Sequence, residues 1–299
     1  MTNKQKAYLA LTLVNISFGF VGLFVRSSVE AGSDVFLTAF VAWFFAALLI
    51  YLYAILKKKP ITFSFTKPVK YSLWLQGLFF GLTNVFFFSA LTRTTIANAE
   101  FIHKTMPIWA AIVAYFVLKE RFTTRKLAAT GLTILGLSLL FNFDFSSSTF
   151  TGDIHAFIAS LFFAGMVVNA RRLKHVPHLV STFFQVAIGS LVALPFVAWN
   201  YPYVITDYQQ LIIALVIISV LLTAITQVFL LYAFRHLEAS KGSLFMILQP
   251  VSAAIVGWVL LGEALSAQSL IGIGLVLLGV LAVVLPKFRQ PIPESNQVK

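Results

Sequence analysis

Long apolar runs, separated by short polar connections, follow one another along nearly the whole chain. A membrane-crossing helix needs about 20 mostly apolar residues, because the hydrocarbon core of a bilayer is about 30 Å thick. The apolar positions within the runs are continuous and do not alternate with polar ones, which favours helices over the strands of a membrane barrel. We therefore predict an all-α membrane protein with ten transmembrane helices, over residues 6–26, 34–56, 69–91, 95–118, 125–143, 153–171, 179–199, 209–234, 241–261 and 267–285.

The composition supports a membrane protein. Of the 299 residues, 59% are hydrophobic and only 11% are charged, which leaves too few polar residues to cover so much apolar surface in water. A net charge of +12 in a soluble protein would suggest binding to nucleic acid. Here the basic residues cluster between the apolar runs, so we expect a lipid bilayer and no nucleic acid as partner. The absence of cysteine excludes disulfides and cysteine-bound metals.

Lysine and arginine set the predicted orientation, because connections on the cytoplasmic side of a membrane are enriched in them. With both termini in the cytoplasm, 19 of the 22 basic residues lie on the cytoplasmic side. Only Arg26 and Arg93 then lie outside, and Lys104 lies within a span. A model with nine or eleven spans would spoil this asymmetry.

The two halves of the chain share a pattern at an offset of 143 positions. The matching pairs include Pro107 with Pro250, Glu120 with Glu263, Gly131 with Gly274 and Gly136 with Gly279. The predicted organisation is a first five-helix repeat over residues 1–143, an extracytoplasmic linker over 144–152, a second repeat over 153–285 and a cytoplasmic tail over 286–299. Because five is odd, the second repeat enters the membrane inverted, a construction that is frequent in secondary transporters.

The repeated motif resembles the drug/metabolite transporter superfamily, in its EamA-type branch. Two copies of Pro-x-x-Ala-Ala-Ile-Val-x-x-x-x-Leu-x-Glu stand at 107–120 and 250–263, each followed by Leu-x-x-x-Gly-x-x-x-x-Gly, at 127–136 and 270–279. The resemblance covers residues 7 to 285. It implies ten helices, inverted halves, a central cavity and the transport of a small metabolite, often outward.

The fourth predicted span carries three ionisable residues, Glu100, His103 and Lys104. They lie three and four positions apart, so they share one helical face. Ionisable groups inside a membrane usually face a cavity or a partner, which makes these three candidates for substrate binding. The alternative is a self-neutralising Glu100–Lys104 pair, with His103 hydrogen-bonded to a neighbour. The equivalent residues of the second repeat, Ser243, Met246 and Ile247, carry no charge.

Three amides complete the predicted substrate site. Asn15, Asn84 and Gln249 lie well within their spans, where each could contact the solute or form a hydrogen bond between helices. The repeated Pro107 and Pro250 are predicted hinges, because proline removes a backbone donor and kinks a helix.

The repeated glycines predict close helix packing. Gly131, Gly136, Gly274 and Gly279 are expected to join the fourth span to the fifth and the ninth to the tenth, and a dimer interface is the alternative. Glu120 and Glu263, at span ends, are expected to cap a helix or to pair with a basic residue.

Together these patterns predict a non-enzymatic secondary transporter in the cell membrane that exports a small polar metabolite, such as an amino acid or its derivative, by alternating access. The alternatives are a drug, sugar or nucleotide-derivative transporter of the same fold, a membrane scaffold or sensor, and an intramembrane enzyme. We expect no catalytic residue, metal or cofactor. Solute gradients or protons are the energy sources left open, and the protein is a monomer or a homodimer. No phosphate-binding loop of an ATPase is present.

Overall fold

The computed structural model describes residues 1–58, 61–121, 123–141, 150–262 and 264–284, and the regular elements of these residues are all helices. Residues 142–149, which include most of the predicted linker, lie outside the described residues, as do the predicted tail and Glu263.

The described residues contain ten helical segments that are long and apolar enough to cross a membrane, as predicted. Four segments are single helices at the sides: α3 (Val35–Leu56), α4 (Lys67–Leu91), α7 (Thr124–Phe141) and α14 (Ala267–Val284). Two more are α8 (Phe150–Arg172), continued by the short η2 (Leu173–His175), and α9 (His178–Trp199). The remaining four are composite: α1 (Asn3–Gly19) with α2 (Val21–Glu30), α5 (Ile96–His103) with α6 (Met106–Leu118), α10 (Tyr208–Ile217) with η3 (Ile218–Ile225) and α11 (Thr226–His236), and α12 (Ala239–Phe245) with α13 (Leu248–Leu261). Helix α8 already begins at Phe150, so the predicted linker 144–152 extends too far into the second half.

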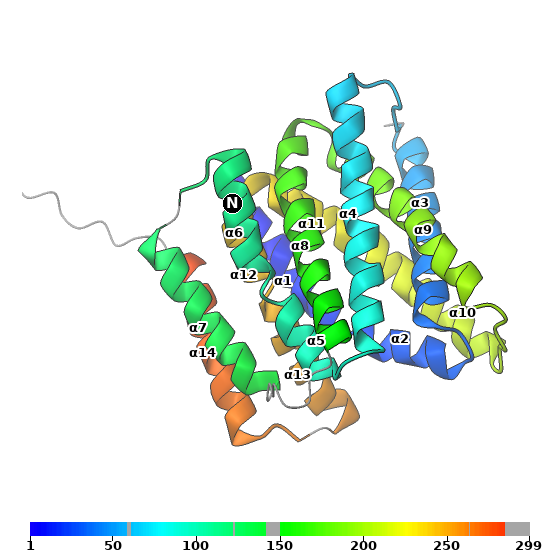
Figure 1. Ribbon diagram of the computed structural model, residues 1–299. Coiled ribbons are helices and arrows are strands. Elements are labelled where there is room, and N and C mark those ends of the chain that lie inside the picture. The colour runs from blue at the N-terminus through cyan, green and yellow to red at the C-terminus, as the bar shows by residue number, and fades with distance from the viewer. Residues whose placement is uncertain (59–60, 122, 142–149, 263, 285–299) are drawn as a thin grey trace, which may run out of the picture.

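The halves pack together as an inverted pair. Helix α4, from the third span, packs on α8 of the sixth, and α11 of the eighth span packs on α1 of the first. In the same way α6 packs on α8 and α13 packs on α1. Each of these contacts therefore occurs twice, with the roles of the two halves exchanged. The two fifth helices, α7 and α14, lie side by side at one end of the molecule (Figure 1).

The fourth and ninth spans are broken at nearly equivalent places. Lys104 and Thr105 separate α5 from α6, and Met246 and Ile247 separate α12 from α13. Each break lies just before one of the repeated prolines, Pro107 and Pro250, whose rings leave no backbone donor for the helix that ends there. Tighter turns replace the lost bonds, since Ile108 N donates to Thr105 O at 2.9 Å and Gln249 N donates to Met246 O at 3.2 Å.

The carboxylate of Glu120 joins the end of the fourth span to the start of the ninth. It accepts hydrogen bonds from Ala239 N at 2.8 Å and from Ser240 Oγ at 3.0 Å, at the N-terminus of α12, and lies 3.6 Å from Arg171 Nε. The expectation that Glu120 caps a helix or pairs with a basic residue is confirmed. Because the fourth span ends where the ninth begins, the two spans run in opposite directions through the membrane.

Both broken spans end in a left-handed residue. Lys119 follows α6 with φ 57°, and Gly262, its counterpart at the offset of 143, follows α13 with φ 68°. Glycine adopts this conformation freely, whereas a side chain with a Cβ costs roughly 1–2 kcal/mol. The first half therefore bears a strain at Lys119 that the second half avoids.

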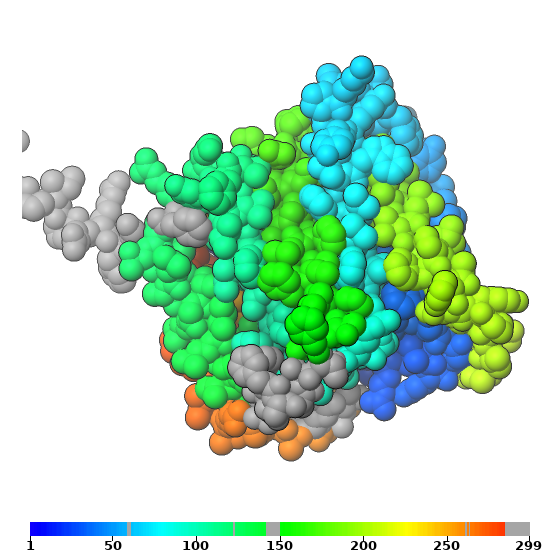
Figure 2. All heavy atoms as spheres, viewed as in Figure 1, coloured from blue at the N-terminus to red at the C-terminus, as the bar shows by residue number. Residues whose placement is uncertain are grey.

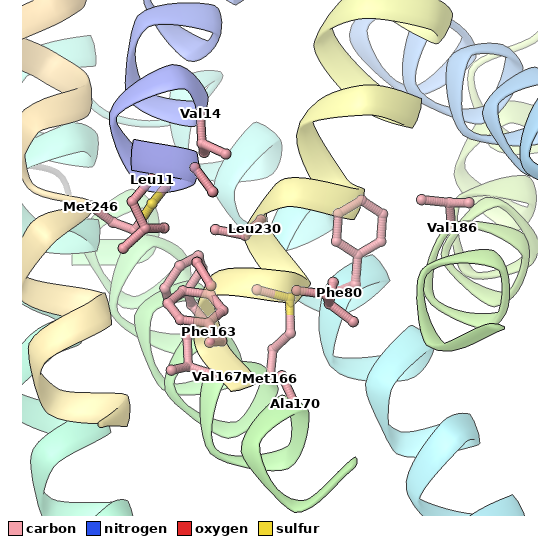
Figure 3. Packing of buried hydrophobic residues seen from close by; sticks show 14 of the residues in the cluster. Leu11, Val14, Phe80, Phe163, Met166, Val167, Ala170, Val186, Leu230 and Met246 are labelled. Carbon is pink, nitrogen blue, oxygen red and sulfur yellow. The ribbon is translucent and has the colours of Figure 1, made fainter. Parts of the chain in front are cut away.

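Apolar packing holds the middle of the molecule. Phe163 and Val167 of α8 lie near Met246 at the break and Leu11 of α1, with Leu230 of α11 close by (Figure 3). Outward-facing side chains are also apolar, for example Phe44 and Leu52 of α3. Figure 2 shows how the side chains of α4, in cyan, stand at the surface of one face. An apolar exterior of this kind suits a lipid environment.

A chain of buried amides crosses four spans inside this core. Asn169 Nδ2 donates to Gln76 Oε1 at 2.8 Å, Gln76 Nε2 donates to Gln185 Oε1 at 2.7 Å, and Gln185 Nε2 donates to Gln227 Oε1 at 2.8 Å. Their helices are α8, α4, α9 and α11. Since a buried amide without a partner costs about 1–3 kcal/mol, this chain fixes the register of the four helices.

The repeated glycines pack differently from the prediction. A Cβ at Gly136 would lie 2.7 Å from Gly272 O, and one at Gly279 would lie 2.5 Å from Thr133 Cγ2. These glycines therefore join α7 to α14, the fifth span to the tenth, and the expectation of fourth-to-fifth and ninth-to-tenth packing was wrong for them. A Cβ at Gly131 or Gly274 would meet nothing within 4 Å, so neither allows a close approach.

We expect Gly136→Ala to destabilise the protein by about 1–3 kcal/mol, because its methyl group would force α7 away from the backbone of α14. Gly131→Ala, in the same helix, is the matched control and should leave stability unchanged or slightly raised. Thermal unfolding in detergent compares the two variants. Equal unfolding temperatures would contradict the assigned contact.

Candidate functional site

Lys104 is the centre of the candidate site. It is among the largest of the described side chains that are almost fully buried, with 1% of its surface exposed. Its Nζ donates to Gln249 Oε1 at 3.0 Å and lies 3.5 Å from Glu100 Oε2. The Glu100–Lys104 pair of the alternative interpretation is therefore present, and Gln249, a predicted substrate-binding residue, reaches Lys104 from the other half of the chain.

The two helix breaks bring these groups together. Lys104 follows the last residue of α5, where the negative end of the helix dipole favours a cation. Gln249 lies in the first turn of α13, directly after the other break. At 1.5 Å per residue, α5 and α12 are about 12 Å and 10 Å long, so each break lies well inside a hydrocarbon core of about 30 Å.

Asn15 of α1 binds the second break. Its Nδ2 donates to Leu11 O at 2.8 Å and to Phe245 O at 3.3 Å, the last carbonyl of α12. Its Oδ1 is buried and has no hydrogen-bond partner among the described residues. Asn15 therefore satisfies one carbonyl at the break and leaves an acceptor beside it.

His103 lies between aromatic rings. Its ring centroid is 4.6 Å from that of Phe87 and 5.9 Å from that of Phe163. Both ring nitrogens are buried, and neither has a hydrogen-bond partner in the described part of the chain. The alternative prediction, that His103 forms a hydrogen bond with a neighbouring residue, is thus wrong for the described residues. The two ring nitrogens are available to a bound molecule.

Asn84, another predicted substrate-binding residue, forms a hydrogen bond within its own helix and not to Lys104. Its Nδ2 donates to Phe80 O at 2.8 Å, one turn back in its own helix. This bond belongs to α4, so the structure gives Asn84 a local role that its position in the sequence did not distinguish from solute contact.

A cavity of about 700 Å³ opens on the face that carries the N-terminus, between α1, α6, α7, the start of α12 and the end of α14. Tyr8 lines it, and the Tyr8 ring centroid is 5.5 Å from that of Phe245. Because the carbonyl of Phe245 binds Asn15, this aromatic pair lies between the cavity and the buried site. In the sequence, the basic residues of this region indicate only orientation in the membrane, and no motif marks the cavity that they line.

A carboxylate at the edge of the cavity ties two spans together. Glu238 lies 2.6 Å from Lys126 Nζ at the start of α7 and 2.9 Å from Lys241 Nζ of α12. Burial raises the pKa of Glu238, but the hydrogen bonds and charges of Lys126 and Lys241 together outweigh it and hold the pKa below its ordinary value. Glu238 is therefore ionised when the two lysines hold it.

Comparison with known proteins gives a consistent result. The model of the EamA-like transporter family matches residues 5–142 and 150–285. A protein named "Uncharacterized transporter" from Archaeoglobus fulgidus is 25% identical, over 91% of this chain and 94% of its own length. The "Uncharacterized transporter YcxC" of Bacillus subtilis is also 25% identical, over 92% of this chain and 91% of its own.

Two further similarities concern function and fold. The "Pseudopaline exporter CntI" of Pseudomonas aeruginosa is 27% identical over 71% of this chain and 72% of its own length. A crystal structure with 20% sequence identity superimposes with a TM-score of 0.80, over 94% of this chain and 96% of that chain. At this identity the superposition shows the fold alone.

We expect the tie between Glu238 and its two lysines to give a pH dependence. A carboxylate whose pKa is lowered by folding stabilises the protein above its ordinary pKa, and the stabilisation is lost as the pH falls through the folded value. Glu238→Gln should therefore unfold at a lower temperature than wild type at pH 7, and the difference should shrink below pH 4.5, the ordinary value for Glu. A difference that stays constant from pH 7 to pH 3 would contradict this account.

His103→Leu should raise the unfolding temperature, because leucine fills a similar volume without leaving two buried nitrogens unpaired. The expected gain is about 1–3 kcal/mol, the cost of a buried polar group without a partner. Ser219→Ala is a suitable control, since Ser219 is also buried but its Oγ is bonded to Leu215 O at 2.6 Å. A destabilised His103→Leu protein would show that the imidazole makes a favourable bond in the folded state.

Proposed function

Since this chain belongs to the EamA-like transporter family, we propose that it is a secondary transporter that exports a small polar metabolite, an amino acid or its derivative, across the cytoplasmic membrane. Membership in the family makes it a multi-pass membrane transporter without enzymatic activity. The proposal concerns the nature of the solute, the direction of transport and the residues that bind the solute.

The buried Lys104 carries the proposal. An ammonium group inside a membrane protein is expensive, and such groups are found on solute or ion pathways. Lys104 touches a carboxylate of its own half, Glu100, and an amide of the other half, Gln249. A cation and an anion within 3.5 Å of each other match a solute that carries both a carboxylate and an amine. The solute's carboxylate would take the place of Gln249 at Lys104, and its amine would bind Glu100.

Two further groups support binding at this place. The free Oδ1 of Asn15 and the unpaired nitrogens of His103 are buried polar atoms without protein partners in the described residues. Since buried polar groups are almost always paired, such atoms suit a bound solute or water. Asn84, bonded within α4, would serve the helix and not the solute.

Alternating access would use the paired breaks. Pro107 and Pro250 follow them, so α6 and α13 would tilt against α5 and α12 while Lys104 and Gln249 separate. With the N-terminal face in the cytoplasm, as the basic residues predict, the cavity beside Tyr8 opens inward and the described conformation is inward-facing. Outward opening would separate Lys104 from Gln249.

One relative supports export, and the relatives leave the solute open. One relative is named an exporter of a metabolite, pseudopaline. A drug, sugar or nucleotide derivative is the second candidate of the same fold. An uncharged sugar would need no cation at the centre, so the buried Lys104 favours a solute with an anionic group.

The test compares metabolites in the medium of cells that express the wild type, Lys104→Met or Lys70→Met at equal membrane levels. Lys104→Met keeps the length of the side chain and removes its charge, and we expect at least a tenfold loss of export, the equivalent of about 1.4 kcal/mol. Lys70 is exposed in α4, so its variant should export normally. Equal export by Lys104→Met and wild type would remove Lys104 from the pathway.

Gln249→Glu gives a second, independent prediction. The new carboxylate would lie where Gln249 Oε1 now accepts from Lys104, at 3.0 Å. It would compete with the carboxylate of the solute, so export should fall while the protein stays as stable as wild type or becomes more stable. Export that is unchanged at neutral pH would indicate that the solute does not bind Lys104 through an anionic group.

A further inference from the structure

The cavity on the N-terminal face contains more positive charge than its own acids can neutralise. Its described lining includes six basic residues and two acidic ones, which are Lys4, Lys119, Arg121, Arg125, Lys126 and Lys241 with Glu120 and Glu238. Both acids are already used. Glu120 caps α12 and faces Arg171, and Glu238 binds Lys126 and Lys241.

Three of the basic side chains are not neutralised by an acidic residue of the described chain. Lys4, Lys119 and Arg121 take part in none of the ion pairs formed among the described residues. They come from the start of α1 and from the segment that follows α6, so two parts of the chain that are far apart in sequence direct cations into one cavity. A cleft lined by one sign of charge concentrates ions of the opposite sign.

The backbone at Lys119 is a separate observation that points to the same cavity. Lys119 has φ 57°, a conformation in which the second half of the chain carries Gly262. A lysine is disfavoured there, and backbone strain of this kind is enriched at functional sites. Orientation of the protein in the membrane explains why this face carries basic residues. It does not explain a lysine at a position whose backbone conformation favours glycine.

We propose that this cavity is a binding site for an anion of the phosphate or polycarboxylate type, held by Lys4, Lys119 and Arg121. Its volume of about 700 Å³ falls in the range of small-molecule sites. Arginine supplies a planar pair of donors to such an anion and lysine a point charge. The site is distinct from the one around Lys104, and it does not depend on the proposed transport.

Binding is measured on the purified full chain in neutral detergent, with inorganic pyrophosphate as the probe and the ionic strength held constant with chloride. The variants are Lys119→Gly, Lys119→Arg and the control Lys174→Gln, which removes an exposed lysine outside the cavity. Pyrophosphate should raise the unfolding temperature of the wild type. Lys119→Gly should unfold at a higher temperature without the probe, because glycine relieves the backbone, yet bind pyrophosphate roughly threefold to tenfold more weakly. Lys119→Arg and Lys174→Gln should bind it like wild type.

A second arm identifies the source of the anion. The same variants are compared in nanodiscs of neutral lipid and of lipid that contains phosphatidylglycerol. Stabilisation by pyrophosphate that Lys119→Gly weakens assigns the cavity to a soluble anion. Stabilisation by phosphatidylglycerol alone, weakened by Lys119→Gly in the same way, assigns it to the phosphate of a lipid headgroup.

Three results would overturn the proposal. The first is that neither pyrophosphate nor phosphatidylglycerol stabilises the wild type. The second is that Lys119→Gly responds as wild type does. The third is that Lys174→Gln loses as much affinity as Lys119→Gly, because the charge of the whole face would then explain the binding. No solute flux enters these measurements, so their failure would leave the proposal for Lys104 untouched.

Discussion

The centre of the molecule depends on the need to satisfy one buried ammonium group. Removing a charge from water costs several kcal/mol unless hydrogen bonds and an opposite charge compensate. Lys104 obtains these from Gln249, from Glu100 and from the C-terminal end of α5. The helix end and Gln249 depend on the breaks in the fourth and ninth spans, whereas Glu100 lies one turn before Lys104 in the same span. The prolines that interrupt the helices thereby create the environment that a cation requires.

The repeat provides the frame, and departures from the repeat provide the chemistry. Each half has a broken span that ends in a left-handed residue. Each half also contributes one helix to the antiparallel contact of α7 with α14. Lys104 has an isoleucine, Ile247, as its counterpart, and the strained Lys119 has Gly262. A rocking motion needs features that occur twice, whereas recognition of an asymmetric solute needs features that occur once. The two lysines are of the second kind.

The sequence was sufficient for the spans and the duplication, because these follow from local hydropathy and from an offset. The cost of a charge in a membrane also marks Lys104 as a candidate. It was not sufficient for partners. Gln249 was a candidate for substrate binding because it lies well within its span, but nothing in the spacing of 145 residues predicts its hydrogen bond to Lys104. Gly136 was correctly expected to pack closely but was assigned to the wrong helix, because sequence neighbours in this fold are not always packing neighbours. The amide chain through Gln76 and Gln185 likewise exists only once four helices are assembled.

The central claim is that the region between Lys104 and Gln249 opens alternately to the two sides of the membrane. The natural chain has no cysteine, so a single Gln249→Cys variant can be labelled without background. The measurement is the rate of its reaction with a membrane-impermeant maleimide, added from either side of sealed vesicles, with Met166→Cys in the apolar core as the unreactive control. Our account predicts labelling of position 249 from both sides. Labelling from one side only, or from neither, would contradict it.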